Sequence, residues 1–403
     1  MRLSYSALTL VLALPGLAFA QTPPPPRPGL APAVTEAPAP APAPAPAPIV
    51  EIAAPAPAEA AAAAPAPAAA PAAPPVTWTF EGLVDAYYMY NFTGDPKNQG
   101  PLGRQFDTNA NSFTLNYVKL GAQADTDFFA LRADVGAGHT AGVINAANIQ
   151  FSTGTAPAAA VDANAFLVQQ AFATLKLSPQ LTLDFGRFTT NAGAEVIESN
   201  KNWLYSRSLL FFGIPLQHTG VRLGYQVSPM LKVQASIVNG WNNDPDVNSD
   251  KTYGLSLFLT PPDSGLTAIL NTYFGKERAG ADTTILVDAV VTKDIGAISV
   301  GGNLDYFKTG DINWFGISGM AKYTLSDSFN LAGRVEFIKD KNAYAGIDGS
   351  LYEVTVQGAY TVNKHYELRA EFRFDGSDKE IFLKGADKKK NQATGLVAAL
   401  AYF

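Results

Sequence analysis

The most constraining feature of this 403-residue chain is a strict alternation of apolar and charged side chains near its carboxyl end. From His365 to Phe374, the even positions are aromatic or aliphatic and the odd positions are His, Glu or Arg. Successive side chains of a β-strand point to opposite faces, so this pattern predicts a strand with one apolar and one charged face. The segments 329–337 and 352–362 repeat it.

Segments of this kind, separated by turn residues, follow one another from residue 76 to the end of the chain. We expect sixteen strands, at 77–91, 112–124, 128–137, 165–177, 180–189, 216–228, 230–241, 251–261, 265–276, 283–294, 297–308, 313–325, 329–340, 351–362, 365–376 and 393–403. The pattern is weakest in 112–124 and 297–308, so fourteen strands is the alternative count.

The expected connections alternate between short turns, such as Ser178-Pro179 and Ser228-Pro229, and longer, more polar loops, such as 138–164 and 190–215. An even strand count with short turns at one rim and long loops at the other is typical of outer-membrane barrels. A soluble sandwich has no reason to sort its loops this way. We therefore expect an all-β fold: a single transmembrane antiparallel β-barrel over 76–403.

The amino end indicates export. Arg2, an apolar run from Leu3 to Leu17 and the small-x-small site Ala18-Phe19-Ala20 predict a signal peptide over 1–20, cleaved between Ala20 and Gln21. Residues 21–75 are rich in Ala and Pro, which predicts a disordered linker, because proline prevents helix and sheet from propagating. We expect this linker to be periplasmic. It is a plain spacer or, alternatively, a tether to peptidoglycan.

The net charge and the residue composition limit which partners and activities we expect. A formal charge of -6 argues against nucleic acid, and only three histidines and no cysteine argue against an enzyme. Lys388-Lys389-Lys390 on the last long loop is expected to contact anionic lipopolysaccharide. The terminal Phe403 resembles the signal that outer-membrane barrels present to their assembly machinery. We expect a monomer or a homotrimer.

A central segment resembles a known family. Leu183 to Thr190 reads LDFGRFTT and is followed by Gly193-Ala194-Glu195; His218 to Arg222 and Asn239 to Asn242 continue the similarity in order. This series is similar to the OmpL-like β-barrel porin family. The resemblance implies a pore and no enzymatic activity.

The resemblance also implies that the third long loop, 190–215, folds into the lumen and narrows it. Glu195, Glu198, Lys201 and Arg207 lie on this loop at spacings that suit a short helix. Charges at a narrow point set ion selectivity, because a partly dehydrated ion meets them at short range. The alternative is an ordinary loop on the outer surface, in which these charges have no part in selectivity.

The alternation places about ten acids and seven bases on the lumen face, so we expect a weak preference for cations. The candidate pore-lining residues on the strands are Asp184, His218, Arg222, Arg334, Glu336, Glu367, Arg369, Glu371 and Arg373.

Asp244, Asp246, Asn248 and Asp250 have the alternate-oxygen spacing of a calcium loop, but Ser249 and Leu255 stand where its glycine and bidentate glutamate belong. We expect no cofactor, with Ca²⁺ here as a weak alternative. The sequence thus predicts an outer-membrane porin for small hydrophilic solutes and ions. The alternative function is an envelope protein that links the outer membrane to the cell wall through its Ala/Pro segment.

Overall fold

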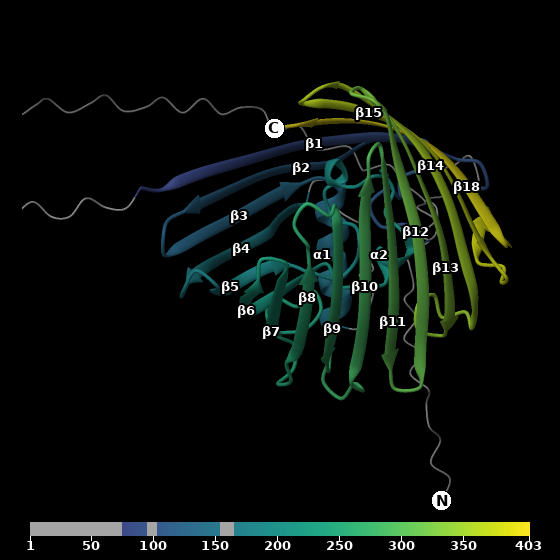
Figure 1. Cartoon of the computed structure of the whole chain (residues 1–403). Helices are drawn as coiled ribbons and strands as arrows, with labels where there is room; N and C mark the ends of the chain where they lie inside the picture. The colour runs from purple at the N-terminus through teal and green to yellow at the C-terminus, as the bar shows by residue number, and fades with distance from the viewer. Residues whose placement is uncertain (1–74, 95–102, 154–164) are drawn as a thin grey trace, which may run out of the picture. The chain divides into compact units, whose positions relative to one another are not determined.

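The computed structural model describes residues 75–94, 103–153 and 165–403 (Figure 1). The predicted signal peptide and residues 21–74 of the predicted linker lie outside the described residues. The described residues form one closed antiparallel barrel of sixteen strands. The strands are β1 Thr77–Asn91, β2 Ser112–Asp125, β3 Phe129–Ala137, β4 Phe166–Lys176, β5 Leu181–Thr189, β6 Gln217–Ser228, β7 Leu231–Val238, β8 Thr252–Leu259, β9 Leu266–Gly275, β10 Thr284–Ile295, β11 Ile298–Thr309, β12 Ile312–Ser326, β13 Phe329–Lys341, β14 Gly349–Asn363, β15 Tyr366–Ser377 and β18 Asn391–Tyr402.

The predicted strand count is confirmed, and the alternative of fourteen strands is wrong. Both doubtful segments are strands of the barrel, because β2 pairs with β1 and β3, and β11 pairs with β10 and β12. The sheet closes where β1 pairs with β18, from Leu83 opposite Tyr402 to Asn91 opposite Thr394. Gly82 and Phe403 then exchange two backbone hydrogen bonds, of 3.2 and 3.1 Å.

Burial is inverted relative to a soluble sheet. Along β15, Glu367, Arg369, Glu371 and Arg373 are buried, whereas Leu368 and Phe372 are 49% and 47% exposed. The predicted charged face therefore points into the barrel and the apolar face points outward, as a lipid environment requires. No helix among the described residues is long and apolar enough to cross a membrane.

The connections sort by rim as predicted, with one exception. At the rim with the short turns, β6 and β7 are joined by residues 229–230, and β14 and β15 by 364–365. The opposite rim has the long loops, but β11 and β12 meet there through only Gly310 and Asp311, so the alternation is not strict. The long loops contain helix α1 His139–Thr153, the 3-10 turn η1 Ser199–Lys201, helix α2 Leu209–Phe212 and the hairpin of β16 Phe382–Lys384 and β17 Asp387–Lys389.

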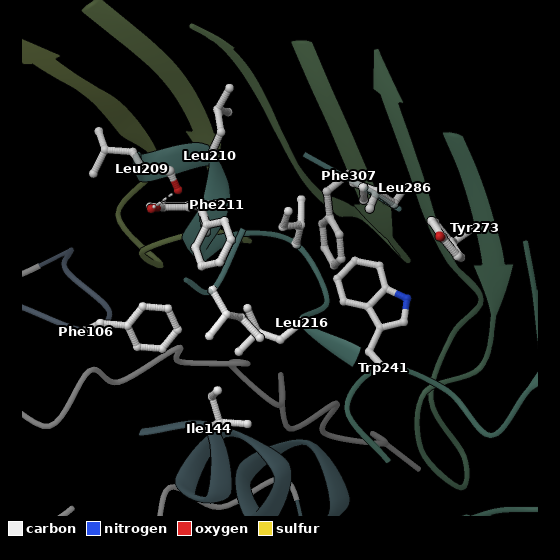
Figure 2. Packing of buried hydrophobic residues seen from close by; sticks show 14 of the residues in the cluster. Phe106, Ile144, Leu209, Leu210, Phe211, Leu216, Trp241, Tyr273, Leu286 and Phe307 are labelled. Atoms are coloured by element: carbon white, nitrogen blue, oxygen red, sulfur yellow. Dashed lines mark hydrogen bonds between the residues drawn. The ribbon is translucent and has the colours of Figure 1, made fainter. Parts of the chain in front are cut away.

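An apolar core lies among the long loops (Figure 2). Phe106 and Phe211, from two different loops, pack edge to face with ring centroids 5.9 Å apart. Trp241 from a further loop packs against Phe307 of β11 at 5.7 Å. Ile144 of α1 belongs to the same cluster. These aromatic contacts fix the long loops against one another and against the barrel wall.

Gly186 interrupts the alternation of β5. Its φ is 134°, and a Cβ built on it would lie 2.3 Å from the carbonyl oxygen of Ala171 on the neighbouring strand β4. Arg187, which the alternation alone would turn toward lipid, is instead 14% exposed and pairs with Asp244 at 3.1 Å. A glycine is required here because only glycine adopts this backbone conformation without strain.

Gly186→Ala is therefore expected to destabilise the barrel. Strained backbone at positive φ costs about 1–3 kcal/mol, and the contact with Ala171 adds to it. Gly319→Ala is the matched control, because a Cβ there would lie 3.8 Å from Val335, an ordinary contact. The measurement is the denaturant concentration at which half of each variant is unfolded. Unfolding is monitored by the heat-modifiable gel mobility of the folded barrel. Equal midpoints for the two variants would contradict this account of Gly186.

Candidate functional site

The third long loop crosses the lumen. The Asn191 amide donates hydrogen bonds to Gln234 of β7 at 2.6 Å and to Ser256 of β8 at 3.1 Å. Further along the loop, the Tyr205 hydroxyl donates to Asp85 of β1 at 2.7 Å, and the Tyr205 backbone N–H donates to Gln357 of β14 at 2.7 Å. Because these strands lie on different sides of the barrel, the loop lies inside it and is not an outward surface loop.

The charged residues of this loop pair with the wall. Glu195 binds Arg334 of β13 at 2.7 Å, Glu198 binds Lys119 of β2, and Lys201 lies 3.0 Å from Glu81 of β1. Glu195, Glu198 and Lys201 are therefore each compensated by a charge of the barrel wall. The predicted short helix over these residues is wrong, because only the three residues of η1 form a helical turn there.

The pKa of Glu198 shows the direction in which this pairing acts. Burial acts to raise the pKa of the Glu198 carboxyl, but the Lys119 ammonium beside it outweighs burial, so the pKa is lowered from its usual value. The Gln169 amide of β4 also donates to Glu198, at 3.1 Å. The carboxylate is thus held in its charged form against the wall.

Arg334 is the centre of the largest charge cluster. Its guanidinium is 0% exposed and lies 2.7 Å from Glu195, 3.0 Å from Glu353 and 3.5 Å from Glu336. It also donates to the Ser206 carbonyl of the loop at 2.9 Å. Removing one partner from a buried ion cluster of this kind typically costs about 3–5 kcal/mol, because the other charges lose their compensation.

Two wall carboxylates hold the loop through its backbone. Glu371 of β15 accepts hydrogen bonds from the N–H groups of Tyr205 and Ser206, at 3.0 and 3.1 Å. Glu336 of β13 accepts one from Leu209 N–H at 2.7 Å, where α2 begins. Hydrogen bonds to a charged acceptor are about twice as strong as neutral ones, so these contacts determine the path of the loop.

Three arginines bind backbone carbonyls of the loop. Arg373 donates to the Arg207 carbonyl at 2.6 Å and pairs with Asp375. Arg369, paired with Glu367, donates to the Ser199 carbonyl at 3.0 Å. Arg207 itself donates to the Val196 carbonyl at 3.2 Å and to those of Tyr205 and Ile197. These three predicted site residues thus lie together, on or beside the loop.

The remaining predicted lining residues lie apart from that cluster. Asp184 accepts from Nε and Nη2 of Arg222, both at 2.9 Å, and the guanidinium lies 4.2 Å from the centroid of the Phe188 ring. His218 is 1% exposed, its Nδ1 is 3.1 Å from the Gly240 carbonyl, and its ring stacks on Tyr273. Asp184 and Arg222 face the lumen as a pair, whereas His218 is packed among protein groups.

The four residues of the calcium alternative do not converge. Asp244 pairs with Arg187 and Asp246 with Lys251, while the Asn248 amide donates to the Lys276 carbonyl at 2.9 Å. Asp250 donates its backbone N–H to Asn248 at 2.7 Å. Within the part of the chain that the structure describes, no three His, Cys, Asp or Glu residues form a group that could hold a metal ion. Ca²⁺ binding by this loop stays a prediction.

Lys119 is a lumen residue that the sequence analysis missed. The pairing of β1 with β2 shifts register at Asp85 and Ala86, so the neighbouring residues Asn116 and Tyr117 are both buried. The bulge moves Lys119 to the lumen face, where simple alternation would turn it toward lipid. Asn116 is the extra residue of the bulge, and a single Asn within a strand pattern is too common to predict one, so alternation alone does not find Lys119.

An apolar exterior, a charged interior and a long loop within the lumen define a transmembrane barrel of the porin class. The chain belongs to the family described as "Putative beta-barrel porin-2, OmpL-like", whose model matches residues 77–403. It is accordingly a multi-pass protein of the outer membrane. A search of curated proteins found no match.

Solved structures agree with this fold. The outer membrane channel DcaP of Acinetobacter baumannii is 13% identical, with 81% of this chain and 97% of that chain covered and a TM-score of 0.57. An anion-selective porin from Comamonas acidovorans is also 13% identical, covering 82% and 100%, with a TM-score of 0.55. A trimer form of OmpT, an outer membrane protein of Vibrio cholerae, is 15% identical, covering 81% and 99%, also at 0.55. Identities this low show the shared fold alone.

Arg334→Met is expected to loosen the third loop. The change leaves Glu195, Glu336 and Glu353 without their shared cation, so the loop should lose its main contact with β13. We expect faster proteolysis within 190–215 and an altered single-channel conductance in planar bilayers. Arg222→Met is the matched control, because among the described residues Arg222 pairs with Asp184 and with none of the four charged residues of the third loop. Equal proteolysis of the two variants would contradict a central role for Arg334.

Helix α1 should respond to acid. His139 at its start is 3% exposed and its Nε2 is 2.7 Å from the Thr108 hydroxyl. Burial lowers the pKa of His139 from 6.5 to about 4, against a smaller opposing effect of Asp107. The folded state therefore binds this proton more weakly than the unfolded state does, and stability falls as the pH drops from 6.5 toward 4.

The loss for a shift of this size is at most about 3 kcal/mol, at 1.36 kcal/mol per pKa unit. The measurement is hydrogen exchange of the α1 amides at pH 7 and pH 4.5, corrected for the intrinsic pH dependence. We expect lower protection at pH 4.5 in the wild type and a smaller change in His139→Gln. The same pH response in both proteins would show that another group is responsible.

Proposed function

We propose that this outer-membrane barrel allows passive diffusion of small hydrophilic solutes and ions, with a weak preference for cations. The observation that carries the proposal is the third loop, which crosses a charged lumen and contacts β1, β7, β8 and β14. A long loop inside a polar barrel narrows the lumen and leaves a path lined by polar groups. Charged side chains at such a narrow point select among ions. Glu195, Glu198, Lys201 and Arg207 are the proposed constriction residues.

The role of a channel rather than an enzyme is supported by how the histidines are used. His139 and His218 are buried in contacts with protein groups, and Nδ1 of His365 lies 3.0 Å from the Tyr402 carbonyl. Arg334, Glu336 and Glu371 are buried charged residues that contact the third loop directly, and Glu353 pairs with Arg334. Their contacts favour a structural use of the buried charges over acid–base chemistry.

The cation preference rests on an acidic surplus. Asp340 and Asp375 are two buried acids on lumen-facing positions that add to the surplus expected from the alternation, and Lys119 adds one base. Most of these charges pair across the wall, so the net effect on ions is small. Screening with a length of about 10 Å at 0.1 M salt reduces it further.

The cellular setting is also a proposal. We place the short turns, the cleaved amino end and the linker 21–75 in the periplasm, with the exposed Lys388, Lys389 and Lys390 toward lipopolysaccharide. Phe403 would be read by the barrel-assembly machinery, and the barrel would act as a monomer or a homotrimer. The envelope-protein alternative depends on contact between 21–75 and peptidoglycan, and residues 21–74 lie outside the described residues.

Conductance in planar bilayers tests this function. We compare the full mature chain with a variant lacking 22–75, using heat-unfolded protein as the control. Both folded proteins should conduct, because a proline-rich linker adds neither sheet nor core. In a salt gradient the reversal potential should have a small cation-selective sign that fades at molar salt.

Absence of conductance from both folded proteins would overturn the pore and favour the envelope role. An anion-selective sign would contradict the cation preference alone. It would point to Lys232 and Lys322, whose ammonium groups lie over the rings of Phe258 and Trp203, at 5.8 and 5.5 Å from the centroids.

A further inference from the structure

Three exposed lysines lie on the outward face of the barrel, close to the long-loop rim. On β11, Lys308 is exposed, like Tyr306 two positions before it on the same face. On β13, Lys339 and Lys341 are exposed and alternate with buried side chains that face the lumen. The strands β11, β12 and β13 are neighbours in the sheet (Figure 1). The lysines therefore point away from the lumen, on one part of the outer wall.

The strand register places these lysines at one level of the wall. Lys308 is opposite Asn313 of β12, and Phe315, two positions further along β12, is opposite Lys339 of β13. Lys341, two positions beyond Lys339, is therefore level with Lys308. Adjacent strands are about 4.8 Å apart, so the backbones of Lys308 and Lys341 are separated by roughly 10 Å. Long, flexible lysine side chains can approach one anionic headgroup from both strands.

Polar side chains continue the same level on the strands beside the lysines. Asn313 is partly exposed on the outward face of β12, next to the buried Trp314. Ser350 of β14 is opposite Lys339, whose ammonium group donates to the Ser350 hydroxyl at 3.5 Å. We call Lys308, Asn313, Lys339, Lys341 and Ser350 the outer strip.

Acidic side chains of the protein do not neutralise the outer strip. Among the described residues, no carboxylate lies within 4.0 Å of the ammonium groups of Lys308, Lys339 or Lys341. Asp311 and Asp348, on the adjoining connections, are exposed and form no ion pair with these lysines. Like charges at this spacing repel one another, so an external anion between them is stabilised.

Aromatic side chains fix the depth of the outer strip in the membrane. Tyr306, Phe315, Phe337 and Tyr352 face outward beside the strip or one row below it, and they are 37%, 37%, 43% and 42% exposed. Outer-membrane barrels carry such aromatic girdles at the membrane–water interfaces. A lipid-facing lysine is costly at the bilayer midplane and tolerated near the interface. The outer strip therefore lies at the height of the lipid headgroups.

The outer strip is a feature of one side of the barrel. Only Gly310 and Asp311 join β11 to β12, so no long loop separates these strands at the rim. At the outer ends of β1, β2 and β4, the exposed side chains are Phe92, Phe113 and Phe166, at 59%, 88% and 63%. Lysine is thus not a general requirement of this rim, and its placement on β11 and β13 indicates recognition of an anion there.

We propose that the outer strip binds the phosphate groups of a phosphorylated lipid of the outer leaflet, with the aromatic row against its acyl chains. Ammonium groups bind phosphate through charge-assisted hydrogen bonds, and hydroxyl and amide groups add further donors. This site is separate from Lys388, Lys389 and Lys390 beside the β16–β17 hairpin. The inference rests on the proposed placement of the long-loop rim outside the cell. It does not rest on conduction, because the strip is on the outer wall.

The test uses the folded full-length barrel in nonionic detergent, with lipid A that carries two phosphates as the probe. Native mass spectrometry counts the bound lipid, and the unfolding temperature reports binding to the folded state. The wild type should bind this probe and unfold at a higher temperature. Lipid A from which the phosphates have been removed should bind at least about tenfold more weakly, because lysines near the headgroup attract the anionic form.

The variant that combines Lys308→Gln, Lys339→Gln and Lys341→Gln should show the same loss with the diphosphorylated probe. These side chains are exposed and unpaired with acids, so the variant should fold and conduct as the wild type does. A failure of lipid binding is thereby distinguished from a failure of the pore. The corresponding Lys→Arg variant keeps the charge and should keep the binding.

Two controls separate the outer strip from other lysines. Lys364→Gln removes an exposed lysine at the short-turn rim, and a second variant replaces Lys388, Lys389 and Lys390 with Gln. Both should retain most of the binding. The proposal is overturned if the wild type does not bind diphosphorylated lipid A, or if removal of the phosphates makes no difference.

It is also overturned if the triple Lys→Gln variant of the outer strip binds as the wild type does, or if only the variant of Lys388, Lys389 and Lys390 loses binding. A changed oligomeric state of the outer-strip variant with unchanged lipid binding would assign the strip to a contact between copies of the chain, and would likewise overturn the proposal.

Discussion

Backbone hydrogen bonding is the constraint on which the rest of this structure depends. In hydrocarbon, an unpaired N–H or C=O group costs several kcal/mol, so a sheet in a membrane must close on itself. Here β18 pairs with both β15 and β1, and the bonds between Gly82 and Phe403 extend the seam to the last residue. Closure removes the sheet edge and creates the enclosed lumen in which every other feature of the site lies.

Closure combined with alternation forces charge inward. Since the outer face must be apolar, the polar positions of all sixteen strands converge on one enclosed space. Charges held there are partly removed from water, and each needs a partner. The wall supplies some partners itself, as in Arg132 with Glu81 at 3.1 Å and Arg222 with Asp184 at 2.9 Å.

The third loop supplies much of the remaining compensation. Its acids bind Arg334 and Lys119, and its backbone N–H groups bind Glu336 and Glu371. The charges that make the wall polar are therefore the same charges that position the loop. A substitution on the lumen face consequently changes two properties together, the charge of the barrel wall and the position of the third loop.

The sequence by itself determined the sixteen strands and the face on which most charges lie, because alternation is a local property with a period of two residues. It also indicated the family, through Leu183 to Thr190. Only the tertiary structure decided which charges meet: Glu195 and Arg334 are 139 residues apart in the chain, and Asp288 faces Asp305 only through the register of β10 and β11. The alternation alone does not show that a bulge at Asn116 turns Lys119 inward. Such contacts depend on barrel closure, strand register and the path of a loop. The residue pattern of a single strand encodes none of these.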